Sequence, residues 1–347
     1  MAKRKRRKPR RTSHGALIFW AAVFVLLLAA LSALAFHAVQ SPFGPESETL
    51  VRIAPGASTT QIARQLESEG VLRTRYSFYL LRWIKRGVLK AGEYRFDHPA
   101  TAAEVYSRIA RGDVYTIALT VPEGANIFEV AARVGQSGLA SRQDFLKAAV
   151  EQVPLVSDLD PAAKSLEGYL FPDTYRFSPP MSAAGIAAAM VKRFRAVAKE
   201  VGLTENVHST VTLASLVERE TAVDSDRPLV ASVYVNRLKK KMPLMADPSV
   251  IYGLELEGRW RGTIYASDLK ANTAYNTYLH AGLPPGPIAN PGLPSLRAAV
   301  NPAQTGFLFF VAAGNDPQGH SVFSATIDEQ ARNVAEYRRA KKRAGAR

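Results

Sequence analysis

The chain has no cysteine among its 347 residues. This absence excludes disulfide bonds, thiolate metal ligands and a cysteine nucleophile. Metal-binding patterns are also missing, because no two of the six histidines have the spacing of an HExxH motif. The sequence contains no phosphate-binding loop, dinucleotide fingerprint or GxSxG serine motif. We therefore expect a protein that works without a metal or cofactor.

Charged residues are missing between Arg11 and Glu46. Within that stretch, residues 16–36 form an almost purely apolar run, which is long enough to cross a hydrocarbon core of ~30 Å as a helix. Eight Lys and Arg among the first 12 residues precede the run, and a basic flank of this kind stays in the cytoplasm. We expect a single-pass anchor in the cell (inner) membrane, with the body of the protein in the periplasm or outside the cell.

A cleaved signal peptide is the alternative interpretation of the same run. The tripeptide Ala33-Leu34-Ala35 has the small residues of a cleavage site. The apolar run is longer than the ~7–15 residues usual in signal peptides. This length favours the anchor.

Positive charge is concentrated at the two ends of the chain. The formal net charge is +15, but the first 12 residues carry eight basic side chains and the last ten carry six. Without these two runs the net charge is +1, so the body lacks the strong basic field that nucleic-acid binding needs. The C-terminal run is interpreted as a solvated tail, with binding of anionic lipid headgroups as the alternative.

Composition and hydrophobic periodicity divide the chain into six segments. In order, they are a basic cytoplasmic segment (1–15), a transmembrane helix (16–36), a polar linker (37–48), a small domain (49–114), a larger mixed domain (115–337) and a basic tail (338–347). The small domain has the predicted order strand, helix, helix, strand, with its strands at 50–53 and 92–96 and a further helix at 102–111. The predicted fold class is therefore α+β.

The larger domain is predicted to begin with a strand at 115–121 and to be rich in helix up to about residue 241. A hairpin is expected from 307–311 and 321–324, followed by a last helix from about residue 328. Residues 166–175 are interpreted as an aromatic-rich turn.

One carboxyl group lies on an apolar helix face. In a helix through VTLASLVERE (211–220), Leu213, Leu216 and Val217 share a face with Glu220. Burial on such a face disfavours the ionised carboxylate and raises its pKa, as a general acid near neutral pH requires. The alternative is a helix-end carboxylate paired with a nearby arginine, Arg219 or Arg227.

Two further carboxylates bear on the type of reaction. Hydrolytic glycosidases normally need a second carboxylate opposite the acid. Glu218 points about 200° away from Glu220 on a regular helix, so it is a poor partner. Asp247 is the next candidate, although an Asp before a proline also organises turns.

A cluster of aromatic and amide side chains follows at Tyr275, Asn276, Thr277 and Tyr278, with Tyr252 upstream. Rings beside fixed donors and acceptors are typical of carbohydrate sites, because they stack on sugar faces. Ordinary packing of a loop explains the same pattern equally well.

Several motifs together closely resemble the endolytic lytic transglycosylases of the YceG-like family. The matching stretches are LEGYLFPDTYRF (166–177), LASLVERET (213–221), VASVYVNRL (230–238), ADPSVIYG (246–253), TAYNTY (273–278), GLPPGPIANPG (282–292) and GHSVF (319–323). They come in the order of the family and follow a basic, membrane-anchored N-terminus. Two departures are mild, since Ala246 and Ala274 replace residues that are not needed for proton transfer.

The resemblance implies a fold, an activity and a site. The region 49–114 resembles a LysM-like subdomain that binds glycan, and the rest resembles the catalytic domain. The essential acid/base glutamate of the family falls on Glu220, and the motifs around Glu218, Asp247 and the aromatic cluster match residues thought to line the cleft. No cofactor or metal is implied, and peptidoglycan synthases are implied partners.

The implied reaction cuts the bond between N-acetylmuramic acid and N-acetylglucosamine in nascent peptidoglycan and leaves 1,6-anhydro ends, which terminates strand elongation. Two alternatives remain open at this point. One is a hydrolytic muramidase that uses a second carboxylate, and the other is a cell-wall binding protein without catalytic activity.

Overall fold

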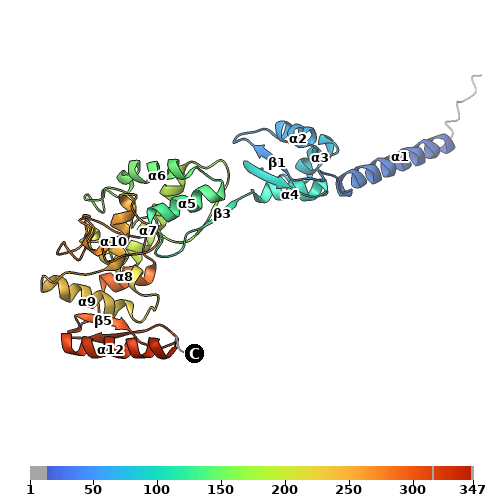
Figure 1. The fold of residues 1–347 in the computed structure, drawn as a ribbon. Coiled ribbons are helices and arrows are strands. Elements are labelled where there is room, and N and C mark those ends of the chain that lie inside the picture. Colours follow the sequence, from blue (N-terminus) through green and yellow to red (C-terminus); the bar gives the residue numbers. More distant parts are fainter. Residues whose placement is uncertain (1–13, 315, 345–347) are drawn as a thin grey trace, which may run out of the picture. The chain divides into compact units, whose positions relative to one another are not determined.

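The computed structural model describes residues 14–314 and 316–344. The chain divides into two compact units, and the boundary between them in sequence falls between Thr116 and Ile117. Each unit has its own hydrophobic core. Helices and short two-stranded sheets are mixed in sequence (Figure 1), so the predicted α+β class is confirmed.

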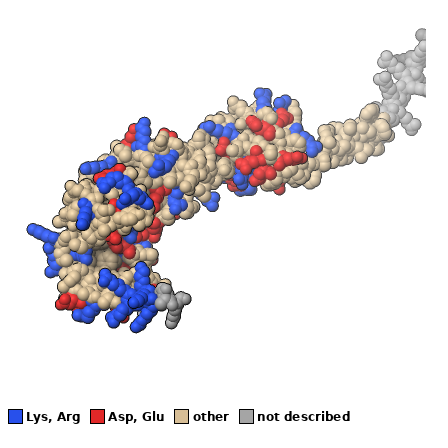
Figure 2. Space-filling view, viewed as in Figure 1, with Lys and Arg blue, Asp and Glu red and all other residues tan. Residues whose placement is uncertain are grey.

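Helix α1 (His14–Gln40) covers the predicted membrane run. Its segment Gly15–Gln40 is long and apolar enough to cross a membrane. The helix carries no Lys, Arg, Asp or Glu, so Figure 2 shows it without charged colour. Near its end, Val39 contacts the core of the first unit.

The rest of the first unit is a two-stranded sheet with three helices. Strand β1 (Thr49–Ile53) pairs antiparallel with β2 (Gly92–Phe96). Between them lie α2 (Thr59–Ser68) and α3 (Arg75–Lys85), and α4 (Ala102–Arg111) follows. Ser58 and Thr101 form capping boxes that begin α2 and α4, because each hydroxyl accepts a bond from a backbone N–H that the first helical turn leaves free.

The second unit is mostly helical. Its elements are β3 (Ile117–Thr120), α5 (Ile127–Ser137), α6 (Arg142–Glu151), η1 (Val153–Leu155), β4 (Thr174–Phe177), α7 (Ala183–Glu200), α8 (Val207–Glu220), α9 (Arg227–Lys239), α10 (Asp247–Leu256), η2 (Asp268–Lys270), α11 (Leu293–Val300), β5 (Phe309–Ala312), β6 (Ser321–Ser324) and α12 (Ile327–Ala344). Helix α8 lies at the centre and contacts α9, α10 and α11. The buried residues of α8 join one large core.

Strand β4 differs from the sequence prediction. The stretch 166–175 is predicted as a turn, but Thr174 and Tyr175 begin a strand that pairs antiparallel with β3. Its register joins Ile117 to Phe177 and Thr120 to Thr174. A strand this short is stabilised by its distant partner, so its own four residues give only a weak signal.

Candidate active site

Glu220 is the last residue of α8. The predicted apolar face of this helix is confirmed, since Leu213, Leu216 and Val217 are all buried in the core of the second unit. Glu220 itself is half-buried. The helix ends here because Thr221 has extended backbone angles, with φ −143° and ψ 137°. The carboxyl group therefore lies where the apolar face of α8 meets the surface.

Tyr234 on α9 donates a hydrogen bond of 2.7 Å to Oε1 of Glu220. The tyrosine is buried and packs edge-on against Phe310 of β5. The pKa of Glu220 is raised above its ordinary value, first because burial disfavours the ionised form and also because Asp247 is nearby. The bond from Tyr234 and the charge of Arg237 act in the opposite direction, but burial outweighs them.

Asp247 is the first residue of α10, and its side chain lies close enough to influence Glu220. The hydroxyl of Tyr278 donates a 2.6 Å hydrogen bond to Oδ1 of Asp247. Pro248 follows within the first helical turn, a position where proline is tolerated because that turn needs no donor. Asp247 thus begins a helix, whereas the sequence also allowed a turn at this position.

Arg237 lies three residues after Tyr234, on the same side of α9. Its guanidinium donates to two backbone carbonyl oxygens, Leu308 O at 2.7 Å and Leu244 O at 2.8 Å. Burial lowers the pKa of Arg237. These bonds hold the cation in place beside Glu220 and Tyr278, so that it contributes a fixed positive charge.

Asn276 and Thr277 position the neighbouring groups. The Asn276 amide donates to Leu269 O at 3.0 Å and to Ala271 O at 2.8 Å, and its Oδ1 accepts from the Tyr278 backbone N–H at 2.9 Å. The Thr277 hydroxyl accepts a 2.9 Å bond from the Ala246 backbone N–H. Both side chains are buried. They fix the loop that carries Tyr278 against the start of α10.

Comparison with known proteins identifies the family of this chain. The model of the YceG-like family matches residues 51–336. The chain belongs to the YceG-like family. The resemblance inferred from the motifs is thereby confirmed.

Relatives of this YceG-like chain have names that describe an activity. It is 33% identical to the endolytic murein transglycosylase of Bacillus subtilis (strain 168), over 85% of this chain and 87% of that protein. It is 29% identical to the endolytic murein transglycosylase of Streptococcus pneumoniae serotype 2, over 90% of this chain and 64% of that protein. A crystal structure of a yceG-like protein of Listeria monocytogenes matches 83% of this chain and 99% of its own, with 30% identity and a TM-score of 0.54.

In this YceG-like chain, Glu218 lies in a buried ion pair instead of beside Glu220. Its Oε1 is 2.9 Å from Nη1 of Arg227, and each side chain is only 5% exposed. Its Oε2 accepts a 2.9 Å bond from the Gly292 backbone N–H. With both oxygens occupied, Glu218 joins α8 to α9 and to the start of α11.

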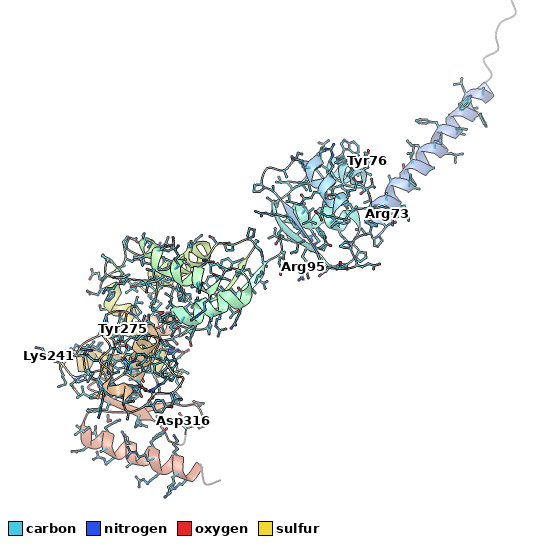
Figure 3. The ribbon with its side chains drawn as sticks, turned by 45° about the horizontal axis from the view of Figure 1, so that its top comes forward. Arg73, Tyr76, Arg95, Lys241, Tyr275 and Asp316 are labelled. Carbon is cyan, nitrogen blue, oxygen red and sulfur yellow. The ribbon has the colours of Figure 1, made fainter. Side chains whose placement is uncertain are left out.

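Tyr252 and Tyr275 form a second cluster around the buried Glu167. Their rings pack edge-on with centroids 5.0 Å apart, and Figure 3 labels Tyr275. Glu167 accepts bonds from the Ile127 backbone N–H at 2.8 Å and from the Asn290 amide at 3.2 Å, but complete burial raises its pKa to about 8. Tyr252 also hydrogen-bonds this carboxyl group and is buried. The predicted aromatic set is therefore divided, because Tyr278 contacts Asp247 while these two rings surround Glu167.

Tyr234, Arg237 and Glu167 lie within the family motifs but are not among the predicted site residues. For the first two, a signal exists: Tyr234 and Arg237 are three residues apart in VASVYVNRL, a helix whose apolar residues mark its buried side. Their relation to Glu220 depends on how α9 packs on α8, which the pattern of one helix does not contain. Glu167 offered no periodic signal, since it lies outside any helix or strand.

Proposed function

We propose that this protein is a lytic transglycosylase that cuts the glycan strands of peptidoglycan within their length. The observation that carries the proposal is the half-buried Glu220. Its raised pKa keeps the protonated form to higher pH than in an exposed glutamate, and Tyr234 fixes one of its oxygens. A general acid needs that combination of proton and orientation. The activity named for the Bacillus and Streptococcus relatives is of this kind.

In the first step, Glu220 donates its proton to the oxygen that links N-acetylmuramic acid to the next N-acetylglucosamine. Tyr234 donates to Oε1, which leaves Oε2 to carry the transferred proton. The electron pair of the glycosidic C1–O bond goes to the leaving oxygen. Positive charge develops at C1 of the muramic residue, as in other glycoside cleavage. Asp247 supplies negative charge near that centre.

In the second step, the Glu220 carboxylate takes a proton from the C6 hydroxyl of the same muramic residue. The oxygen on C6 then bonds to C1 and closes a 1,6-anhydro ring. The carboxyl group ends in its starting state, and no water enters the product. One C1–O bond breaks, to the glycosidic oxygen, and one C1–O bond forms, to the oxygen on C6. Glu220 gives up one proton and regains one, so atoms and charge balance.

The remaining predicted site residues have two roles in this proposal: some contact the sugar, and the others position the residues that do. Tyr278 and Asp247 lie next to the acid and contact sugar directly. Asn276 and Thr277 position Tyr278, Glu218 positions α8 through Arg227, and Tyr252 and Tyr275 support the loops around Glu167.

We further propose that α1 anchors the chain in the cell (inner) membrane with the second unit outside the cytoplasm. The first unit then acts as a LysM-like glycan-binding domain. It has a pocket whose polar lining suits hydroxyl and acetamide groups of a glycan, formed by residues such as Arg95, His98, Glu104, Arg108 and Arg111. Cutting at the membrane surface would act on strands still held by peptidoglycan synthases and would end their elongation.

The test is digestion of purified peptidoglycan by the full protein and its Glu220→Gln variant, with products analysed by mass spectrometry. We expect 1,6-anhydro ends from the wild type and a loss of rate of about 10²–10⁴-fold in the variant. Glu205→Gln, at an exposed position before α8, is the matched control with unchanged rate.

Other products would contradict the proposal. Reducing ends, one water heavier, would indicate a hydrolytic muramidase that uses Asp247 as the second carboxylate. Equal cleavage by wild type and variant would remove Glu220 from the mechanism. Binding without any cleavage by the wild type would indicate a cell-wall binding protein.

A further inference from the structure

Helix α3 has two apolar faces, although a helix at the surface of a domain needs only one. The inner face is accounted for, because Phe78 and Leu81 are buried in the core of the first unit. The outer face carries Tyr76 and Trp83, which are 65% and 72% exposed, and Ile84, which is 60% exposed. An exposed apolar face of this kind marks a contact with something outside the domain.

The outer residues form one continuous stripe. The stripe begins at Tyr76 and continues at Leu80, Trp83 and Ile84, which follow it by four, seven and eight residues. This spacing places the four side chains on one side of the helix. Val88, just past the helix end, is 78% exposed. The stripe thus runs along the whole of α3 and opposite to Phe78 and Leu81.

The segment around the stripe is basic throughout. Residues 70–92 contain six Lys and Arg and no Asp or Glu. Within the described part of the chain, the ion pairs of this segment include only Arg75, which meets Glu67. Arg73 and Arg86, at the two ends of the stripe, are exposed. A row of aromatic and aliphatic side chains beside unpaired cations is typical of helices that lie in the interface of an anionic membrane.

The stripe is close to the end of the proposed membrane helix. Helix α1 contacts α3 and α4, and Phe43 just after α1 forms a β-bridge with Ala100. The Arg73 guanidinium lies 5.3 Å from the centre of the Phe43 ring. Figure 3 shows Arg73 and Tyr76 on the side of the first unit where α1 ends. A surface attached here cannot be far from the bilayer that α1 crosses.

We propose that the outer face of α3 lies in the boundary between headgroups and acyl chains of the outer leaflet of the membrane that α1 crosses, with its arginines on lipid phosphates. The inference rests on the proposed anchoring by α1. A membrane fits better than a protein partner, because the surface combines exposed Trp and Tyr with cations only and adjoins α1. The first unit is then held against the bilayer by two contacts, α1 and α3.

The test uses the full chain with a single tryptophan, because the sequence has only Trp20, Trp83 and Trp260. One variant keeps Trp83 and the other keeps Trp20 in α1, with the remaining tryptophans replaced by Phe. Both are reconstituted in vesicles of phosphatidylglycerol and phosphatidylcholine that contain brominated lipid, which quenches a tryptophan in contact with it. We expect blue-shifted emission of Trp83 and a loss of intensity comparable with that of Trp20.

Further variants test the stripe itself in the background that keeps Trp83. Tyr76→Ser with Ile84→Ser should lose the quenching, whereas Leu256→Ser, at an exposed apolar position in the second unit, should retain it. Changing the exposed Arg73 and Arg86 to Gln should remove the difference between anionic vesicles and phosphatidylcholine alone. Circular dichroism confirms that each variant is folded.

Each opposite outcome has a separate meaning. If Trp20 is quenched while Trp83 emits as in water, the docking of α3 is overturned and the anchor stands. If the Tyr76→Ser, Ile84→Ser variant is quenched like its parent, proximity through α1 explains the signal and the inference fails. If Trp20 is not quenched, α1 is not inserted, and the anchor and the inference fail together. Cleavage by the second unit is tested independently through Glu220.

Discussion

At the scale of single residues, the protonation of Glu220 depends on its burial and on three neighbouring groups. Burial and Asp247 raise its pKa, and Tyr234 and Arg237 lower it. The net direction is upward, so the protonated form persists to higher pH than in an exposed glutamate. A rate that needs the acid form is retained below this raised pKa and falls as the pH rises through it.

Tyr234→Phe removes the hydrogen bond at Oε1 of Glu220 and keeps the ring that packs on Phe310. That bond favours the carboxylate, so its loss raises the pKa of Glu220 further. We expect the alkaline limb of the pH–rate profile for peptidoglycan cleavage to move up by about one to two pH units, because a hydrogen bond to a charged group is worth ~1.5–3 kcal/mol. A limb that stays in place would show that Tyr234 has no effect on the acid.

Asp247→Asn tests the opposite sign. Removal of a nearby negative charge favours ionised Glu220 and lowers its pKa. The alkaline limb should move down by about half a pH unit, with a lower maximal rate if Asp247 also stabilises charge at the sugar. The same profile measured for Tyr234→Phe is the comparison, and shifts of both variants in one direction would contradict the assignment.

The buried apolar face that leads to Glu220 could be predicted from the sequence because it depends on one helix. The spacing from Leu213, Leu216 and Val217 is local, and the structure buries all three. Tyr234 and Arg237 could not be predicted in the same way, because their contacts with Glu220 arise from the packing of α9 on α8. The division of the aromatic set, with Tyr252 around Glu167 and Tyr278 on Asp247, is likewise a property of the folded loops.

At the scale of helices and strands, the ion pair of Glu218 and Arg227 joins three elements. It connects the end of α8 to the start of α9, and Glu218 also accepts from Gly292 before α11. Both side chains are nearly inaccessible, so loss of one partner leaves an uncompensated buried charge. The position of Glu220, two residues from Glu218, depends on this junction.

Arg227→Met is expected to destabilise the second unit by about 3–5 kcal/mol, the usual cost of breaking a buried pair. Urea unfolding followed by circular dichroism measures the loss. The matched control is Arg297→Met, which breaks the exposed pair with Glu200 and should cost less than ~1 kcal/mol. The double variant Glu218→Gln, Arg227→Met should recover part of the loss. An equal loss of unfolding free energy in the two single variants would show that the buried pair stabilises the unit no more than the exposed one.

Elements with a strong local pattern could be predicted, and those that need a distant partner could not. Strand β2 and helix α4 have the predicted bounds, Gly92–Phe96 and Ala102–Arg111. The hairpin of β5 and β6 also follows from two apolar segments around a turn. Strand β4 is stabilised by β3, which lies far away in sequence, and α10 begins at an Asp-Pro pair that also fits a turn.

At the scale of the whole molecule, buried Glu167 makes stability depend on pH. Three hydrogen bonds favour its carboxylate, but burial raises the pKa from 4.5 to about 8. Between these values the native state holds a proton that the unfolded chain has released. The stabilising contribution of neutral Glu167 is therefore present below about pH 4.5 and is lost as the pH rises to about 8.

We expect the free energy of unfolding of the second unit to fall between pH 5 and pH 8 by up to about 1.4 kcal/mol per pH unit. Glu167→Gln should flatten this dependence, because an amide in the same place does not titrate. Urea midpoints at several pH values give the comparison, with Glu151→Gln at an exposed position of α6 as the control. An unchanged slope in Glu167→Gln would place the dependence elsewhere.

The carboxyl groups of Glu220 and Asp247 lie at opposite poles of two helices. Glu220 is the last residue of α8, and Asp247 is the first of α10. The carboxyl end of a helix is electronegative and repels an anion, whereas the amino end is electropositive and attracts one. The backbone at the end of α8 thus disfavours the ionised form of Glu220, in the same direction as burial. A sequence that kept this glutamate but extended α8 by one turn would lose that contribution.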